Sequence, residues 1–338
     1  MSALSDVARI ADVSKATASR ALSGRGYVSP ATRERVVAAA ATIGYVVSST
    51  ASSLVTGQTR NVGVVIPHIN RWFFGAVLEG IESALIAAGY DLTLYRLSAD
   101  ADERRRVFEY FLVRNRVDAV IAVGIELTPH EVDLLGALAK PIVGIGGPIA
   151  GITMSSIDDV AAAELVTRHL ISLGHSRIMH FGGDQGRELD FRVHAQRLEG
   201  FLAAMAEAGL DSGDATFRST TLSVQGGYEL GLAVLADPRS RPTAIMAGSD
   251  ELAIGTIVAA RQLGIQVPAQ LSVVGIDGHD LADMFGLTTL AQQPEAQGTH
   301  AVELVLARLL APSEHPEAGW HTHPVRLEVR GSTTAPPA

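Results

Sequence analysis

The strongest constraint on the fold is a regular alternation of short apolar runs with longer amphipathic runs, which begins at residue 61 and occurs twice. The apolar runs are rich in valine, isoleucine and alanine, as in NVGVVIP at 61–67 and VDAVIAV at 117–123. Continuous apolar runs of this length are typical of parallel strands that are buried on both faces, and the runs between them have helical length and spacing. The pattern predicts a doubly wound parallel α/β fold.

The alternation restarts after Ile152, which predicts a second α/β lobe of the same kind. Further buried strands are expected at RIMHFGG (177–183), TAIMAG (243–248) and LSVVGID (271–277). A strand at 288–290, a helix at 295–310 and a strand at 325–330 end the pattern. Two such lobes form a cleft between them, and small molecules bind beyond the carboxyl ends of the strands in this class of fold.

The first 60 residues differ from the rest of the chain in charge. They carry seven basic and three acidic side chains, whereas the whole chain of 338 residues has a net charge of −9. A basic segment attached to an acidic body indicates a separate domain whose partner is a polyanion such as nucleic acid. A solvated helical surface that happens to be basic would give the same charge, so the pattern of the segment has to decide.

Residues 5–43 have the pattern of three short helices, with a tight connection after the first and a glycine-rich stop after the second. Ser14 can cap the second helix, and Ser29 followed by a proline marks the start of the third. The third helix is expected to bury a face made of Val36, Val37, Ala40 and Ile43. Two short helices joined by a tight turn, with a third helix behind them, predict a helix-turn-helix motif.

The second predicted helix carries side chains that suit the major groove of DNA. Lys15 and Arg20 can donate to guanine O6 and N7, and Ala16 leaves room for a thymine methyl group. The hydroxyl group of Thr17 suits a phosphate.

The run SDVARIADVSKATASRALSGRGYVSPATRERVVAAAATIGY at 5–45 closely resembles the DNA-binding head of the lactose-repressor (LacI/GalR) family of bacterial transcription regulators. The resemblance implies a homodimer that places two heads on a pseudopalindromic operator. It implies a transcriptional repressor whose operator affinity is controlled by a small effector. The DNA contacts that we expect come from Ser14, Lys15, Ala16, Thr17, Ser19, Arg20, Ser29, Thr32, Tyr45, Ala51 and Leu54.

The segment at 47–60 is the expected hinge between the head and the core. In the family that it resembles, this segment folds into a helix on operator DNA and inserts an apolar side chain into the minor groove, a position that Leu54 occupies. Val47, Ser48 and Ser52 replace residues that are usual in the family. Because serine and threonine are poor helix formers, we expect the hinge to become ordered only on DNA. A plain Ser/Thr linker is the alternative.

The body from residue 61 onward resembles the periplasmic-binding-protein-like core of the same family, for example in the stretch SDELAIGTIVAARQLGIQVPAQLSVVGIDG. The resemblance covers almost the whole chain. The expected domains are a helix-turn-helix domain at 1–46, a hinge at 47–60, a first core lobe at 61–157 plus 289–318, and a second core lobe at 158–288 plus 319–334.

Candidate effector-binding side chains follow the first expected strand, which ends at Pro67. Asn70 can hydrogen-bond a polar ligand, and the aromatic residues Trp72, Phe73 and Phe74 can form a flat apolar wall. The alternative for each ring is packing of the following helix against the core.

The resemblance adds polar candidates, most of them in the second lobe. Arg197 matches a family arginine that binds effector hydroxyls or charges, Asp277 matches an aspartate that accepts from paired hydroxyls, and Gln292 matches a pocket glutamine. Ser249 stands where the family often has an asparagine, and Arg192 lies near Arg197.

The acids at 158 and 159 have two interpretations. Asp158 follows a crossover between the lobes, and its neighbour Asp159 stands where the family often has an asparagine. Each acid is equally well suited to cap a helix.

The candidate side chains limit the effector to a few chemical classes. Two acids, an arginine, amides and aromatic rings fit a neutral polyhydroxylated molecule, so we expect a sugar or a sugar derivative. A purine or a sugar phosphate would also satisfy Arg197 with Arg192 nearby. By analogy with the family, we expect the effector to release the protein from DNA.

Other classes of protein lack support in the sequence. Cysteine is absent, which excludes disulfides, thiolate zinc sites and cysteine nucleophiles. Neither the P-loop motif nor the serine nucleophile elbow occurs, so we expect no enzyme activity and no cofactor. The histidines at 315, 321 and 323 could bind a metal, but the start of a solvent-facing strand is the better interpretation, and no metal site is expected.

Two rival functions remain open from the core alone. A sugar-binding protein of transport shares the two-lobed core, but it needs an export signal, and MSALSDVARIADVSK lacks the apolar run of one. A sugar-processing α/β enzyme is the second rival. No apolar run has the length of a membrane span, so we expect a cytoplasmic protein that does not contact membranes.

Overall fold

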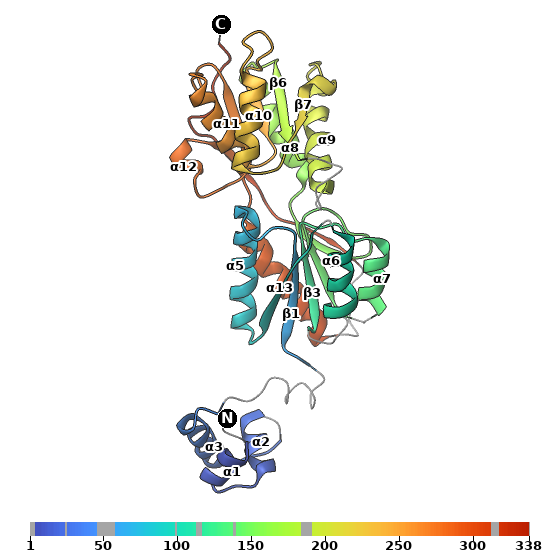
Figure 1. Cartoon of the computed structure of the whole chain (residues 1–338), viewed down its shortest axis with the longest axis vertical. Helices are drawn as coiled ribbons and strands as arrows, with labels where there is room; N and C mark the ends of the chain where they lie inside the picture. The colour runs from blue at the N-terminus through green and yellow to red at the C-terminus, as the bar shows by residue number, and fades with distance from the viewer. Residues whose placement is uncertain are drawn as a thin grey trace. The chain divides into compact units, whose positions relative to one another are not determined.

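The computed structural model of the chain describes residues 4–23, 26–45, 58–98, 100–112, 117–137, 140–183, 191–311 and 318–337. The chain divides into two compact units, a head that ends at Arg60 and a core that begins at Asn61. Figure 1 shows the helices of the head and the two α/β lobes of the core. Each unit has its own apolar interior.

The head is a bundle of three helices, α1 at Leu4–Ile10, α2 at Lys15–Ser23 and α3 at Pro30–Thr42. Small and β-branched side chains fill its centre, and Val7, Ala18 and Val36 are completely buried there. The three-helix arrangement expected for the head is therefore confirmed.

One expectation for α3 is wrong. Val37 was expected on the buried face, but its side chain is 51% exposed. Ala39 joins Val36 and Ala40 in the interior instead, because residues three and four positions apart lie on the same face of a helix.

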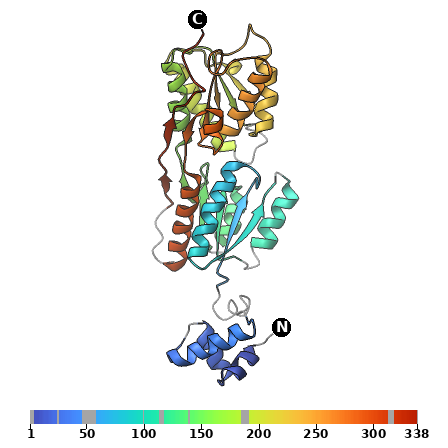
Figure 2. The ribbon, with the colours of Figure 1, turned by 90° about the vertical axis from the view of Figure 1, so that its left-hand side faces the viewer.

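The first lobe of the core contains a six-stranded parallel sheet in the order β11-β5-β4-β3-β1-β2. Its strands are β1 at Asn61–Ile66, β2 at Asp91–Arg96, β3 at Ala119–Val123, β4 at Ile142–Ile145, β5 at Thr153–Ser156 and β11 at Trp320–Thr322. Helices α5 at Trp72–Ala87 and α13 at Pro294–Leu310 pack on one face of this sheet. Figures 1 and 2 show these two helices side by side.

The opposite face of the first sheet is covered by helices from the middle of the lobe. They are α6 at Ala101–Arg106, its π-helical continuation η1 at Val107–Leu112, and α7 at Pro129–Ala137. Phe108 of η1 and Leu135 of α7 are buried against the sheet.

The second lobe repeats the design with the strand order β12-β10-β9-β8-β6-β7, in which only the described pair β10–β12 is antiparallel. Its strands are β6 at Ile178–Gly182, β7 at Phe217–Ser219, β8 at Ala244–Ala247, β9 at Ser272–Asp277, β10 at Thr288–Ala291 and β12 at Arg326–Glu328. Its helices are α8 at Asp159–Ser172, α9 at Phe191–Glu207, the 3-10 turn η2 at Asp214–Thr216, α10 at Val224–Leu235, α11 at Asp250–Gln262 and α12 at Ala282–Phe285. The predicted doubly wound core is confirmed.

The chain crosses between the lobes three times. The first crossover follows β5, the second joins β10 to α13, and the third joins β11 to β12. Because β10 pairs with β9 and β11 pairs with β5, the second and third crossovers lie a few residues beyond the limits expected at 288 and 318. The lobe limits themselves remain an interpretation.

None of the helices in the described part of the chain combines the length and the apolarity that crossing a lipid bilayer requires.

Candidate DNA-binding surface and effector cavity

Helix α2 presents a polar face at the surface of the head. Ser14 precedes the helix, and its side-chain oxygen accepts from the backbone N–H of Thr17 at 3.1 Å. Ala18 and Ala21, on the opposite face of α2, are buried in the interior of the head. The candidate DNA-reading side chains of this segment are all exposed or partly exposed: Ser14, Lys15, Ala16, Thr17, Ser19 and Arg20.

The remaining candidates of the head surround α3. Ser29 caps α3, because its Oγ accepts from the backbone N–H of Thr32 at 3.3 Å and its hydroxyl group donates to Thr32 Oγ1 at 2.8 Å. Tyr45 is partly buried and packs against the interior of the head. The two hinge candidates, Ala51 and Leu54, lie outside the residues that the structure describes.

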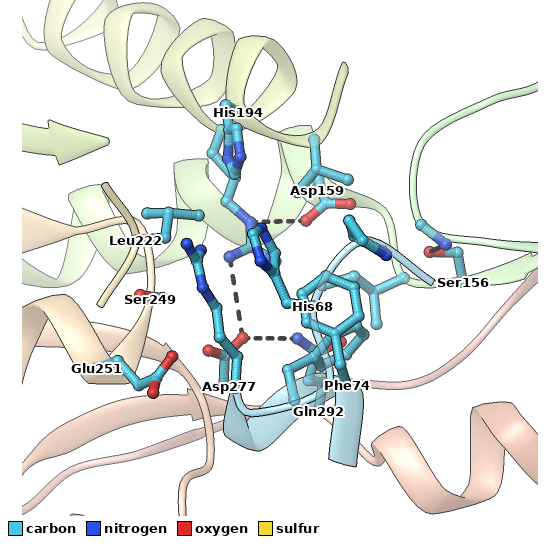
Figure 3. Close-up of a pocket in the computed structure, with 17 residues that line it drawn as sticks. His68, Phe74, Ser156, Asp159, His194, Leu222, Ser249, Glu251, Asp277 and Gln292 are labelled. Carbon is cyan, nitrogen blue, oxygen red and sulfur yellow. Dashed lines mark hydrogen bonds and ion pairs between the residues drawn. The ribbon is translucent and has the colours of Figure 1, made fainter. Parts of the chain in front are cut away.

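A cavity lies in the core and is lined by residues of both lobes (Figure 3). The lining follows the carboxyl ends of strands, as expected for a doubly wound sheet. The first lobe contributes Pro67, His68, Arg71, Phe73, Phe74, Gly146 and Ser156. The remaining lining residues are Ile157, Asp159, Val193, His194, Arg197, Leu222, Ser249, Glu251, Asp277 and Gln292.

Arg197 on α9 connects the acids of the cavity. Its Nε donates to Asp159 Oδ1 at 2.8 Å, and its Nη1 lies 3.9 Å from Asp277 Oδ1. Nη1 also donates to the carbonyl oxygen of Gly248. Burial raises the pKa of Asp159, and the Arg197 guanidinium opposes the shift. These contacts fix the direction of the guanidinium fork, which suits paired oxygen acceptors.

Asp277 stands at the end of β9, where the second lobe meets the crossover segment. Its Oδ1 accepts from Gln292 Nε2 at 2.8 Å, and Gln297 Nε2 in turn donates to Gln292 Oε1 at 2.9 Å. The backbone φ of Asp277 is 143°, a value that residues with side chains rarely adopt and that is often found at functional sites. Burial raises the pKa of Asp277 to about 7, with the Arg197 guanidinium opposing and the Asp250 carboxylate adding to the shift.

Glu251, near the start of α11, is a second cavity acid with a raised pKa. Burial raises the pKa of Glu251 to about 7, the Asp277 carboxylate adds to the shift, and Arg71 and His68 of the first lobe oppose it. Among the described residues, no hydrogen bond or ion pair holds this carboxylate. Glu251 can therefore accept hydrogen bonds from a molecule in the cavity.

The apolar wall of the cavity comes from the first turn of α5. Phe73 and Phe74 meet edge to face, with ring centroids 5.5 Å apart. The ring of His68 meets Phe74 in the same manner at 5.8 Å. Figure 3 shows His68 and Phe74 near Gln292. A flat ring or the apolar face of a sugar can pack against such a wall.

The structure brings six of the nine effector candidates together around this cavity: Phe73, Phe74, Arg197, Ser249, Asp277 and Gln292. Ser249 also caps α11 by accepting from the backbone N–H of Leu252 at 3.3 Å. Of the two neighbouring acids, Asp158 caps α8 and Asp159 lines the cavity.

Three candidates do not line the cavity. Asn70 is exposed, and Arg192 pairs with Glu126 of the first lobe at 3.5 Å. The ring of Trp72 stacks on His279 of the second lobe. Neighbouring residues of a helix point about 100° apart, so Trp72 cannot face the same side as both phenylalanines.

Sequence reasoning missed several lining residues, and some of them left a signal. His194 lies one helical turn before Arg197, a spacing that places both on one face of α9. Arg192 does not share that spacing with Arg197. Glu251 follows the cap of α11 by two positions, which no motif marks.

The histidine cluster lies outside the cavity. Ser155 Oγ is 3.0 Å from His300 Nδ1 and 2.8 Å from His323 Nε2, and the ring of His321 meets His300. His315 lies outside the described residues. Within the described part of the chain, no group of three or more histidine, aspartate or glutamate side chains is arranged to hold a metal ion.

Comparison with known proteins finds one family match in the head and one in the core. Residues 3–48 match the bacterial regulatory proteins of the lacI family, and residues 167–333 match the periplasmic binding protein-like domain. The HTH-type transcriptional repressor PurR of Vibrio vulnificus (strain CMCP6) is 31% identical over 340 residues, which cover 98% of each chain.

Two solved structures of similar chains contain a sugar. The transcriptional regulator CelR in complex with cellobiose has a TM-score of 0.72 and 26% identity, and the match covers 98% of this chain and 100% of that chain. A LacI family transcriptional regulator from Enterococcus faecium with bound ribose has a TM-score of 0.71 and 26% identity, over 81% of this chain and 99% of that chain.

A helix-turn-helix head joined to a two-lobed core with a polar internal cavity defines a DNA-binding regulator that responds to a small molecule. The match of head and core, with a relative 31% identical over nearly the full length, makes the family explicit. The chain belongs to the lacI family of bacterial transcriptional regulators.

Proposed function

We propose that this regulator is a repressor that binds a pseudopalindromic operator as a homodimer and is released by a sugar-like effector in the core cavity. The observation that carries the proposal is the network of Arg197, Asp159, Asp277 and Gln292 at the cavity wall. The protein would act by binding alone, without a cofactor or a chemical step. As a DNA-binding regulator it would work in the bacterial cytoplasm.

The charges of the cavity favour a neutral effector rich in hydroxyl groups. Three carboxylates line it, those of Asp159, Glu251 and Asp277, against the guanidinium groups of Arg71 and Arg197. Hydroxyl groups can donate to these carboxylates and accept from the arginines. A sugar phosphate would add anionic charge beside the carboxylates, which costs free energy in a partly buried site. The sugars bound by the two similar regulators support the same class.

A purine is the second candidate. The edge-to-face pair of Phe73 and Phe74 offers an aromatic wall to a flat base, and the relative named above is called PurR. The two classes are separated by measuring binding of both sugars and nucleobases.

The effector would couple to DNA through the lobes. A molecule that contacts Phe73 of one lobe and Asp277 of the other favours one arrangement of the two lobes over the rest. The hinge at 47–60 precedes β1 of the first lobe, so a change in the lobes can alter its order. Such coupling is reciprocal and typically amounts to ~1–3 kcal/mol.

The variant Asp277→Asn tests the effector site. It keeps the shape of the side chain but removes the charge that accepts from paired hydroxyls. We expect operator affinity to stay at the wild-type level while the effector no longer changes it. Asp133→Asn, on the exposed surface of α7, is the matched control. A retained effector response in Asp277→Asn would remove Asp277 from the site.

A further inference from the structure

A ring contact joins the two lobes directly beside the cavity. The indole of Trp72 stacks on the imidazole of His279 with centroids 4.9 Å apart and planes 24° apart. Trp72 belongs to α5 of the first lobe, and His279 follows β9 of the second. Both side chains are partly buried. A contact of this kind links the two lobes through side chains of the chain itself.

Trp72, the first partner of the stack, belongs to α5, the helix that carries the aromatic wall of the cavity. Trp72 is the first residue of α5, and Phe73 and Phe74, which line the cavity, follow it immediately. The backbone connects the three residues rigidly, because they occupy the first turn of one helix. Any contact that holds Trp72 therefore also holds the aromatic wall in place relative to the second lobe.

His279, the second partner of the stack, is held in place by hydrogen bonds within the second lobe. The backbone N–H groups of Gly278 and His279 donate to Asp250 Oδ2 at 2.9 and 2.8 Å. His279 Nδ1 accepts from the backbone N–H of Leu281 at 3.0 Å, which fixes the plane of the ring. Asp277, one of the acids that line the cavity, lies two residues earlier. The stack thus joins the segment that carries Phe73 and Phe74 to the segment that carries Asp277.

We propose that the stack of Trp72 on His279 is a clasp that positions the two walls of the effector cavity, so that both residues control effector affinity without touching the effector. This proposal rests on the proposed function for its link to the effector, but the clasp itself is a contact between two side chains of this chain. A clasp that favours the closed core raises the fraction of molecules that are ready to bind, and the apparent affinity rises with that fraction.

The protonation of His279 gives the clasp a signature of its own. Burial lowers the pKa of His279, and the neighbouring carboxylate of Asp280 opposes the shift. Two further acids lie at this loop, Asp250, which binds the backbone, and Asp277, while Trp72 on α5 carries no charge. A proton on Nδ1 would remove the bond from the Leu281 N–H, since a protonated nitrogen cannot accept. The surroundings of Trp72 should therefore change with pH.

Tryptophan fluorescence reads the clasp directly. The chain has two tryptophans, so Trp320→Phe leaves Trp72 as the only one. In this background we compare His279→Ala and His279→Phe, with His130→Ala on the exposed surface of α7 as the matched control. We expect His279→Ala to raise acrylamide quenching of Trp72 toward that of free N-acetyltryptophanamide and to shift its emission to the red. His279→Phe should restore the parent values, and His130→Ala should leave them unchanged.

A pH titration of the Trp320→Phe protein keeps the test valid if the alanine variant fails to fold. The emission of Trp72 should change in one transition with a midpoint below 6.5, the ordinary pKa of histidine. The transition should be absent in His279→Phe. Unchanged quenching in a folded His279→Ala, or the same transition in His279→Phe, overturns the clasp.

Sugar-dependent release of the protein from operator DNA tests the positioning role of the clasp separately from the proposed function. With cellobiose and ribose as probes, His279→Ala should raise the sugar concentration needed for half-release, and His279→Phe should bring it back. A folded His279→Ala with a wild-type sugar response overturns the positioning role. If neither sugar nor any nucleobase acts on the wild-type protein, the proposed function and the positioning role both fail, while the fluorescence still decides whether the stack forms.

Discussion

At the scale of single residues, the unusual feature of the cavity is that two of its acids share a raised pKa. Burial raises the pKa of both Asp277 and Glu251 to about 7. The Asp277 carboxylate adds to the shift of Glu251, and the Asp250 carboxylate adds to the shift of Asp277. Such groups are common at functional sites, because the environment that raises the pKa also excludes water from a ligand.

This shared shift predicts that effector binding depends on pH through Glu251. Hydroxyl groups that donate to the carboxylate favour its ionised form, so binding releases a proton and affinity rises as the pH rises from 6 to 8. One proton can contribute at most about tenfold per pH unit. The variant Glu251→Gln cannot release that proton, so its affinity should rise less over the same range. Titration calorimetry with cellobiose or ribose at pH 6 and pH 8 measures the difference.

The exposed acid Glu82 on α5 offers the matched control for this prediction. Glu82→Gln should keep the pH dependence of the wild-type protein. An equal dependence in Glu251→Gln would show that Glu251 does not bind the effector through its ionised form.

At the scale of elements, the first lobe depends on the close approach of α5 and α13. A Cβ atom added at Gly80 of α5 would lie 2.1 Å from the carbonyl oxygen of Glu295 on α13. One added at Gly298 of α13 would lie 2.3 Å from the carbonyl oxygen of Val77. The two glycines therefore let the helix backbones touch.

Gly80→Ala should lower the free energy of unfolding of the core by about 1–3 kcal/mol, the usual cost of forcing extra atoms into a packed interior. Gly75→Ala on the same helix is the control, because an added Cβ meets no atom within 4 Å there. The control should be neutral or stabilising, since alanine favours helices over glycine by up to ~1 kcal/mol. Urea unfolding of both variants makes the comparison, and a wild-type stability for Gly80→Ala would contradict the packing account.

The sequence was sufficient for the order of elements, because a buried parallel strand and an amphipathic helix each leave a pattern in a short window. The short strand β11 left a weaker signal. A solvent-facing strand start was expected near His321 and His323, but its three exposed residues carry no apolar run that would fix its limits. Trp72 was misplaced for a different reason. Its position depends on where α5 begins and on what the other lobe presents, and neither is visible in local sequence.

The residues of the candidate site show the same contrast between features that local sequence reveals and features that depend on the other lobe. Asp277 and Arg197 could be predicted because strand ends and family motifs mark them, and both line the cavity. Arg71 and His68 come from the opposite lobe, so only the folded arrangement shows that they face Glu251. A cavity between lobes brings together residues that are far apart in sequence, so local sequence patterns do not predict that they are neighbours.

At the scale of the whole molecule, the proposed function requires that the cavity and the head communicate through the hinge. The hinge at 47–60 lies largely outside the described residues, so its role stays a prediction from sequence. Leu54→Ser tests it, since a serine cannot serve as an apolar wedge in the minor groove. We expect operator affinity to fall while the preferred half-site stays the same. An unchanged affinity in a gel-shift titration would remove Leu54 from the DNA contacts.

The most direct test of the central claim is to bind the full-length protein to a pool of genomic fragments at physiological salt, with and without a panel of sugars and nucleobases. The account predicts enrichment of a short palindrome that one sugar abolishes. A palindrome that appears only in the presence of a small molecule would reverse the proposed direction of control. The absence of any enriched sequence would contradict the assignment of the head as a DNA-binding domain.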